Sequence, residues 1–446
     1  MPIAACARKG RWQGEIVTDR TARKRAGDTG VDSGISRFSF GLVFASYFIL
    51  AVGNMGLISV LPGIGREIGL PDPFIAAAFA ISGIFLASVA PFWARTADRI
   101  GRKPVLITGL AGYTVSMALV GVVVACGLHK LAAWFIIAPC LIAARSIFGL
   151  VGSAILPSGQ AYVAERTPRE TRTRAISSLA GAQGLGTIIG PLIAPLFILP
   201  LVGLSGPMFG FAAIAGITLV LVLQFLNEGP KINFDDEVET AASVAEAEAA
   251  PARAWRDARI MPFVLFGAGM GVAQGAQAQI LPFLIIDTLG APPMQAQASV
   301  TLAMMLGAAS GLVAQWGLIR LFKMKPKDLM KWGASVALLG HLLILTSTNM
   351  WGIMAGYAAS CIGFSFGRPG YTAGLSLSVT QREQGRVAGI IAMLAGINVL
   401  APFFVLIYQH DRNAPFALNA ALIAGVLVYA VVQPRLKHSG VAARVS

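Results

Sequence analysis

Two arginines stand inside long apolar stretches of this sequence. Arg145 lies within 131–162 and Arg368 within 351–376, and neither stretch contains an acid to pair with it. A charge in an apolar interior costs roughly 3 kcal/mol or more, so each arginine should face a cavity or a partner. The two arginines favour an anionic or strongly hydrogen-bond-accepting substrate. The alternative is a structural role in which each guanidinium caps backbone carbonyls.

A second charged site is a short basic loop that contains one acid. Residues 94–103 read Ala-Arg-Thr-Ala-Asp-Arg-Ile-Gly-Arg-Lys. Asp98 can pair with the surrounding cations or accept hydrogen bonds from the N-terminus of another helix. The spacing of Asp98, Gly101 and Arg102 adds information beyond the charge count. The plainer interpretation is a basic loop that sets membrane orientation, with one neutralising acid.

A third pattern is a stripe of small side chains. Ala182, Gly186, Gly190 and Ala194 recur every four residues and so share one helix face. Such a face allows a neighbouring helix to approach closely, and Pro191 adds a bend.

Long apolar helices must position these residues. Of the 446 residues, 56% are hydrophobic and only 13% are charged, with a mean hydropathy of +0.70. A soluble domain carries about 25% charged residues, so lipid must solvate much of this chain. The apolar stretches are continuous rather than alternating, which indicates helices rather than a barrel. The sequence therefore predicts an all-α membrane protein.

Twelve stretches are long enough to cross a bilayer, which takes about 20 residues. The predicted spans are 38–64, 73–94, 104–128, 131–162, 175–199, 207–227, 261–286, 297–321, 329–348, 351–376, 387–409 and 414–434. The fourth is longer than a bilayer needs, so we expect it to tilt or protrude.

The distribution of basic residues predicts the orientation. With the N-terminus in the cytosol, 30 of the 35 Lys and Arg residues lie on the cytosolic side. Three lie in the opposite loops and two within spans. The net charge of +14 is thus a topology signal, and nucleic-acid binding is rejected as its cause. Both termini are predicted to be cytosolic.

The spans divide the chain into two six-helix units. We expect a basic tail (1–37), an N-terminal bundle (38–227), a solvated cytosolic linker (228–260), a C-terminal bundle (261–434) and a short tail (435–446).

An internal repeat supports this division. An offset of 212 residues places Pro157 on Pro369 and Gly184 on Gly396. The fourth and fifth spans thus resemble the tenth and eleventh, as a duplicated unit requires. Arg368 is expected near the depth of Arg145 in the other half. Two pseudo-symmetric bundles facing each other form a central cavity, the geometry of secondary transporters.

Four segments resemble motifs of the major facilitator superfamily. Residues 94–103 are similar to G-x-L-a-D-R-x-G-R-K, with Ala94 and Thr96 at the Gly and Leu positions. Residues 145–149 are similar to R-x-x-Q-G, with Phe148 at the Gln position. Residues 186–195 resemble the antiporter motif G-x-x-x-G-P-x-x-G-G, without its last two glycines. Residues 53–62 resemble a run found in drug exporters.

The resemblance implies roles for particular residues. Asp98, Arg99, Gly101, Arg102 and Lys103 would form a latch between the halves on the cytosolic side. Gly186, Gly190 and Pro191 would form a helix bend that seals against leak and favours exchange. The first, fourth, seventh and tenth spans would line the cavity. They carry the candidate coupling or substrate residues Tyr47, Asn54, Arg145, Gln274, Gln277 and Arg368, and Tyr371 lies three beyond the last. For any single one, interhelical hydrogen bonding is an equal alternative.

The function expected from these features is proton-driven export of a small organic molecule such as a drug, a siderophore or an anionic metabolite. None of the 21 acids lies in mid-membrane. Three routes of proton coupling remain open: protons carried by acids at the ends of the spans (Asp98, Glu165, Asp287), indirect coupling, or a proton carried by the substrate. An uptake permease for an organic anion is the alternative, and a membrane sensor or enzyme is less favoured.

Cofactor chemistry is not indicated. The four cysteines and four histidines are dispersed, and no G-x-x-x-x-G-K-[ST] segment occurs. We expect a monomer without metal or cofactor, in a bacterial inner membrane, whose partners are its substrate, protons and lipid.

Overall fold

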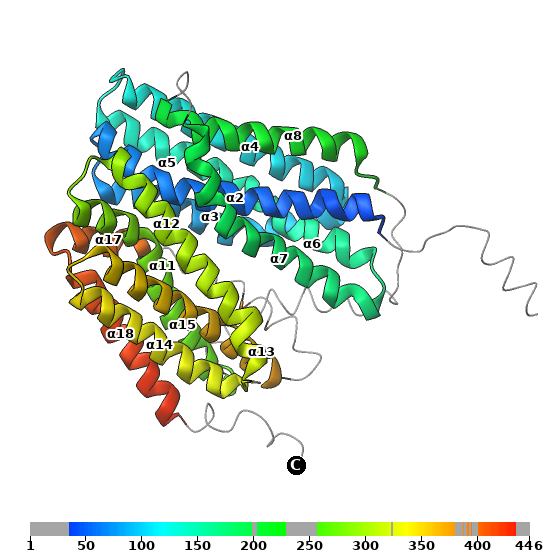
Figure 1. The fold of residues 1–446 in the computed structure, drawn as a ribbon. Coiled ribbons are helices and arrows are strands. Elements are labelled where there is room, and N and C mark those ends of the chain that lie inside the picture. The colour runs from blue at the N-terminus through cyan, green and yellow to red at the C-terminus, as the bar shows by residue number, and fades with distance from the viewer. Residues whose placement is uncertain are drawn as a thin grey trace, which may run out of the picture.

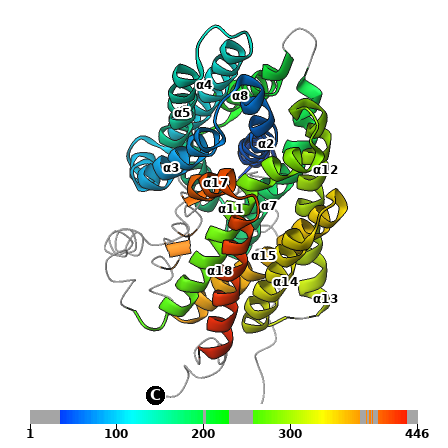
Figure 2. The same cartoon turned by 90° about the vertical axis from the view of Figure 1, so that its left-hand side faces the viewer.

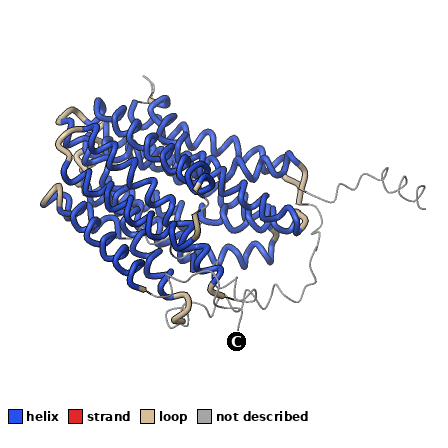
Figure 3. Tube along the Cα trace, turned by 60° about the horizontal axis from the view of Figure 1, so that its bottom comes forward, coloured by secondary structure: helices blue, strands red, loops and turns tan. Residues whose placement is uncertain are grey.

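Long helices account for nearly all of the described chain, and no strand occurs in it (Figure 3). The computed structural model describes residues 35–198, 203–228, 257–322, 324–379 and 400–433, and the single positions 387, 390, 391 and 394. The predicted tails, most of the linker and most of 387–399 lie outside the described residues.

The N-terminal half contains a run of helices that follow the predicted spans. They are α2 (Arg37–Ile68), α3 (Asp72–Ile100), α4 (Arg102–Leu128), α5 (Trp134–Leu150), α6 (Ile155–Glu165), α7 (Arg169–Ile193) and α8 (Gly206–Phe225). Three 3₁₀ turns join them: η1 (Gly152–Ala154), η2 (Ala194–Phe197) and η3 (Gly203–Ser205).

The C-terminal half repeats this arrangement. Its helices are α11 (Met261–Leu289), α12 (Pro293–Leu312), the π-helical η4 (Val313–Leu318), α13 (Ile319–Leu321), α14 (Pro326–Thr346), α15 (Met350–Leu377), α17 (Ala401–His410) and α18 (Ala414–Val432).

Residues with special backbone geometry begin and end several helices. The Ser36 side chain accepts a hydrogen bond from the Ser39 backbone at 3.0 Å and caps α2. Gly69, with φ of 84°, ends α2 in the left-handed conformation. Asp72 lies in the first turn of α3, where its charge suits the positive end of the helix.

Ten helices in the described part are long and apolar enough to cross a membrane, with α5 and α6 counted as one. α15 adds 28 residues, about 42 Å of helix, and α17 is the end of the eleventh predicted span. The predicted class, an all-α multi-pass membrane protein, is confirmed.

The fourth span differs from the continuous helix expected. The 3₁₀ turn η1 divides it into α5 and α6. Close packing accompanies the break: a Cβ on Gly149 would lie 2.3 Å from the Ser82 carbonyl of α3, and one on Gly112 would lie 2.5 Å from Val151. Together α5 and α6 run to Glu165, beyond the predicted end at 162.

The two halves share one pattern of helix neighbours. In the N-terminal half α2 packs on α7, α3 on α5 and α4 on α8. In the other half α11 packs on α17, α12 on α15 and α14 on α18. These are the same three pairs counted from the start of each half, and this gives the repeat a structural counterpart.

The halves meet at one end and diverge at the other. α2 contacts α11 and α12, α7 contacts α12, and α3 contacts α17 (Figures 1 and 2). One hydrophobic cluster joins the N-terminal half to the C-terminal half, including residues 276–286 of α11, while the buried apolar residues of α11 between 263 and 273 belong to a separate cluster within the C-terminal half. Figure 1 shows the two bundles side by side at one end and spreading apart toward the other. We call the joined end the Arg66 end and the other the Asp98 end.

Candidate functional site

The loop between α3 and α4 brings the Asp98 motif together with a second acid. Gly101 ends α3 with φ of 103°, a conformation that favours glycine. Arg102, the next residue, pairs with Asp98 and with Glu165 of α6, where its Nε and Nη2 lie 2.8 and 2.5 Å from Oε1. Arg166 lies 3.6 Å from the other Glu165 oxygen. We call Asp98, Arg102, Glu165 and Arg166 the Asp98 cluster.

The first residue of the predicted linker also touches this loop. The Glu228 carboxylate accepts a hydrogen bond from the Lys103 backbone at 3.4 Å. A Cβ on Gly101 would lie 2.0 Å from the same carboxylate, but this is the far end of a flexible side chain, so the positive φ of Gly101 is the stronger requirement for glycine there. Arg99 is exposed. Glu228, the first linker residue, thus contacts the N-terminal half through this loop.

Arg145 is enclosed within the N-terminal half. Only 2% of its surface is exposed, and its Nη2 donates to the Asn54 side chain at 2.9 Å. The guanidinium lies 5.0 Å from the ring centre of Phe79 and 4.9 Å from that of Phe148. These rings supply cation–π attraction, which is worth about 2 kcal/mol when desolvated. The Nε and Nη1 atoms have no hydrogen-bond partner, so two donors remain free for an acceptor.

The other candidate residues are placed less centrally. The Tyr47 hydroxyl donates to the Leu156 carbonyl of α6, which makes it interhelical in this structure. Arg368 is exposed and lies 18 residues after the start of α15, whereas Arg145 lies 11 after the start of α5. The two arginines therefore do not occupy equivalent positions, and the expectation of matching depth is not supported.

The two glutamines of α11 lie in different surroundings. Gln274 is exposed, whereas Gln277 is 1% exposed and neither atom of its amide has a hydrogen-bond partner. An unsatisfied buried amide costs about 1–3 kcal/mol. Gln277 is thus a second buried polar group, after Arg145, with free bonding capacity.

The glycine stripe of α7 lies against α2. A Cβ on Gly186 would lie 2.5 Å from that of Ala51, and a Cβ on Gly190 would lie 2.3 Å from the Val52 carbonyl. Only glycine permits this approach. α7 ends at Ile193, two residues after Pro191, and continues as the 3₁₀ turn η2.

A charged cluster at the Arg66 end was not foreseen from the sequence. Arg66 of α2 donates to Asp72 of α3 from Nε and Nη2, at 3.0 and 2.7 Å. It also donates to Asp287 of α11 from Nη1 and Nη2, at 2.5 and 3.2 Å. The Tyr408 hydroxyl of α17 donates to Asp287 at 2.6 Å. These four residues form the Arg66 cluster, which joins the two halves.

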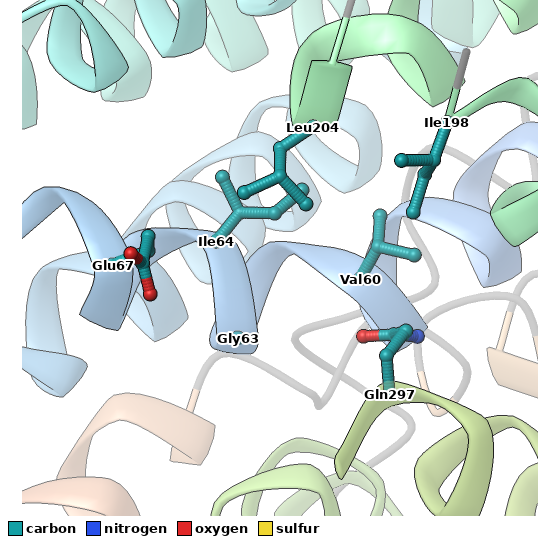
Figure 4. A pocket seen from close by; sticks show the side chains of 7 residues that line it. All are labelled: Val60, Gly63, Ile64, Glu67, Ile198, Leu204 and Gln297. Atoms are coloured by element: carbon teal, nitrogen blue, oxygen red, sulfur yellow. The ribbon is translucent and has the colours of Figure 1, made fainter. Parts of the chain in front are cut away.

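A polar contact and a small pocket lie next to this cluster. Gln297 of α12 donates to the Ser59 carbonyl of α2 at 3.2 Å, again across the halves. Figure 4 shows Gln297 reaching toward α2 beside Val60, with Ile198 and Leu204 opposite. Apart from Glu67 and Gln297 the pocket lining is apolar, and its residues are Val60, Gly63, Ile64, Glu67, Ile198, Leu204 and Gln297.

A signal for the Arg66 cluster was present in the sequence. The side that is poor in basic residues carries few charges, and Arg66, Asp72 and Asp287 all stand at the ends of predicted spans. What the spans alone do not give is which ends lie side by side.

The comparison with protein families agrees with the helix pattern and the motifs. The model of the Major Facilitator Superfamily matches residues 43–402. The chain belongs to this superfamily.

Relatives within the superfamily extend over most of the chain. Multidrug resistance protein 2 of Bacillus subtilis (strain 168) is 25% identical over 370 residues, which cover 81% of this chain and 86% of the relative. The class C tetracycline resistance protein of Escherichia coli is 25% identical over 410 residues, which cover 87% of this chain and 93% of the relative.

Solved structures share the fold. A mutant of the peptide transporter POT in complex with alafosfalin matches with a TM-score of 0.69 and 14% identity, over 89% of this chain and 94% of that one. A bacterial homolog of the human lysosomal transporter Spinster, in an inward-facing and unoccupied conformation, matches with a TM-score of 0.66 and 14% identity, over 90% and 96%.

This Major Facilitator Superfamily chain departs from the R-x-x-Q-G pattern in a way the structure explains. Phe148 stands where the motif has glutamine, and its ring lies against the Arg145 guanidinium. An aromatic face therefore replaces an amide as the neighbour of the buried charge.

Proposed function

We propose that this transporter exports a small organic molecule by alternating access, driven by the proton gradient across a bacterial inner membrane. The observation that carries the proposal is the near full-length similarity to drug and tetracycline resistance proteins. The fold alone does not choose a substrate or a direction.

The arrangement of the halves fits a transporter that loads from the cytosol. From the distribution of basic residues we infer that the Asp98 end lies in the cytosol, with both termini. The halves diverge at that end and are joined at the Arg66 end (Figure 1). A cargo would then enter from the cytosol and leave through the Arg66 end after the halves rock.

Arg145 is the favoured contact for cargo or for coupling. Its free Nε and Nη1 donors suit a carboxylate, phenolate or carbonyl oxygen once the site is reached. Asn54 holds the third donor and fixes the guanidinium between two rings. The acids at the two ends, among them Asp98 and Asp287, are the candidates for accepting protons.

Uptake of an organic anion is the second candidate. It is favoured by the same observation on Arg145, a buried cation with no acid beside it in the described residues. The two functions predict opposite movements of the cargo.

Metabolite profiling separates them. A deletion strain and its parent are compared inside the cells and in spent medium, with the wild-type gene and Arg145→Ala returned on plasmids. A compound retained inside and missing outside, and restored only by the wild type, supports export. A compound left unconsumed in the medium contradicts export and supports uptake.

A further inference from the structure

The Arg66 cluster is built from charges of both halves. Arg66 and Asp72 belong to the N-terminal half, and Asp287 and Tyr408 belong to the C-terminal half. We propose that these four residues are the latch that closes the Arg66 end and that breaks and re-forms in each transport cycle. The proposal rests on alternating access as the proposed function.

The two acids beside Arg66 have different tasks. Asp72 receives two hydrogen bonds, one on each carboxylate oxygen at 3.0 and 2.7 Å, from a residue of its own half. Asp287 receives its bonds across the halves, at 2.5 and 3.2 Å. Separating the halves breaks only the second pair. Asp72 is therefore the residue that holds Arg66, and Asp287 is the residue that closes the latch.

Each half keeps a partner for its own charge when the latch breaks. Arg66 retains Asp72, and Asp287 retains the Tyr408 hydroxyl, which lies 2.6 Å away. The Arg66 and Asp287 side chains are already 21% and 36% exposed, so water can replace the lost bonds. The cost of opening is then that of a partly exposed ion pair rather than a buried one. A contact with these properties can re-form in every cycle.

The latch covers a buried contact that reports its opening. Ser59 lies seven residues before Arg66 on α2, about two turns deeper, and is 1% exposed. Its carbonyl accepts from Gln297 of the other half. The Ser59 hydroxyl donates to the Gly56 carbonyl of its own helix, so Ser59→Cys places a near-isosteric, buried thiol beside this contact, closed to reagent while the latch holds.

The test measures the reaction of this thiol with a membrane-impermeant methanethiosulfonate added from outside the cell. The full-length transporter carries Ser59→Cys in a background without native cysteines. Asp287→Asn should raise the labelling rate roughly 3- to 10-fold, because the open state gains population. Tyr408→Phe should raise it less. Glu67→Gln, which neutralises an exposed acid next to Arg66, is the matched control and should leave the rate unchanged.

The different roles of Asp72 and Asp287 give a more specific test. Asp72→Asn removes a partner that Arg66 keeps in both states and leaves Asp287 as its sole ion-pair acid. The closed state should then be favoured, and labelling should stay equal to that of the parent or fall. Neutralising the two acids that share one arginine is thus expected to have different effects.

Three outcomes would overturn the proposal. One is an unchanged rate in Asp287→Asn protein that is inserted at the parent level. Another is an equal rise in Asp72→Asn and Asp287→Asn, which would indicate general loosening. The last is an equal rise in the Glu67→Gln control. No cargo is added, so a wrong assignment of export or substrate leaves these readings unaffected.

Discussion

The two ends of the molecule carry nearly the same set of charges in different arrangements. At each end one arginine of the N-terminal half lies between two acids. Arg66 has Asp72 and Asp287, and Arg102 has Asp98 and Glu165. Only Asp287 comes from the other half. An arginine with two acids therefore connects the halves when the second acid belongs to the other half, and stabilises one half when both acids belong to it.

Apolar packing follows the same difference. The Arg66 end lies over a hydrophobic cluster that both halves share, whereas the buried apolar residues of α11 between 263 and 273 belong to a cluster within the C-terminal half. In a lipid-solvated protein packing holds helices together, and polar contacts such as Gln297 to Ser59 add to it. The joined end therefore combines packing with an ion pair. At the Asp98 end the ion pairs of the Asp98 cluster all lie within the N-terminal half.

The largest effect is expected when the acid at the Asp98 end is neutralised. Asp98→Asn should abolish transport, because the acid would pair across the halves when the Asp98 end closes. Arg102 keeps Glu165, so insertion and helix packing should survive. Transport of the cargo identified by profiling and the amount of protein in the membrane are measured together. Wild-type flux in this variant would defeat the latch role of Asp98.

Arg145 lies between the ends and has partners only in the N-terminal half. Arg145→Ala should lower transport by roughly tenfold or more, because it removes a charge whose free donors await an acceptor. The labelling rate of Ser59→Cys should not change, because neither end loses a contact. Undiminished transport would reduce Arg145 to a structural residue.

Glu165→Gln tests whether the Asp98 cluster stabilises one half without affecting the Arg66 latch. The change leaves Arg102 with Asp98 alone and weakens charge-assisted bonds within one half, at a cost of about 1–3 kcal/mol of stability. Thermal unfolding of the purified protein should shift downward, while labelling of Ser59→Cys stays at the parent level. A rise in labelling equal to that of Asp287→Asn would show that the two clusters are not separate.

The smallest effect is expected from Tyr408→Phe. The variant loses one hydrogen bond to a carboxylate, worth about 1.5 kcal/mol before exposure to water reduces it. Transport should change by roughly twofold to fivefold. The related Phe283 contact, whose ring centre lies 5.0 Å from the Arg66 guanidinium, remains in place. An effect larger than that of Asp287→Asn would show that the Tyr408 hydroxyl, rather than the Arg66–Asp287 ion pair, contributes most to the latch.

Most of the fold follows from the sequence because membrane helices are local structures. Continuous apolar stretches and the need to satisfy backbone bonds in lipid predict the helices of both halves. The division of the fourth span at Gly152 was not predicted, although Gly152 and Pro157 are local signals for a break, and close packing against other helices accompanies it.

The sequence predicted the site residues that a short segment identifies, but not the contacts between segments that are distant in the chain. The loop at Asp98 and the buried Arg145 stand out by residue type. Residue type does not reveal that Asn54 would hold Arg145 or that Arg66 would meet Asp287, 221 positions away. Those pairs depend on how the two bundles face each other, which periodicity does not encode.

Distances across both ends, measured in one set of proteins, test the account most directly. Spin labels at Ile100 and Leu377 report the Asp98 end, and labels at Leu131 and Asp411 report the Arg66 end. All four positions are exposed. In lipid nanodiscs, Asp287→Asn should lengthen the second distance and shorten the first relative to the parent. Unchanged distances, or lengthening at both ends, would contradict a latch whose release exchanges one opening for the other.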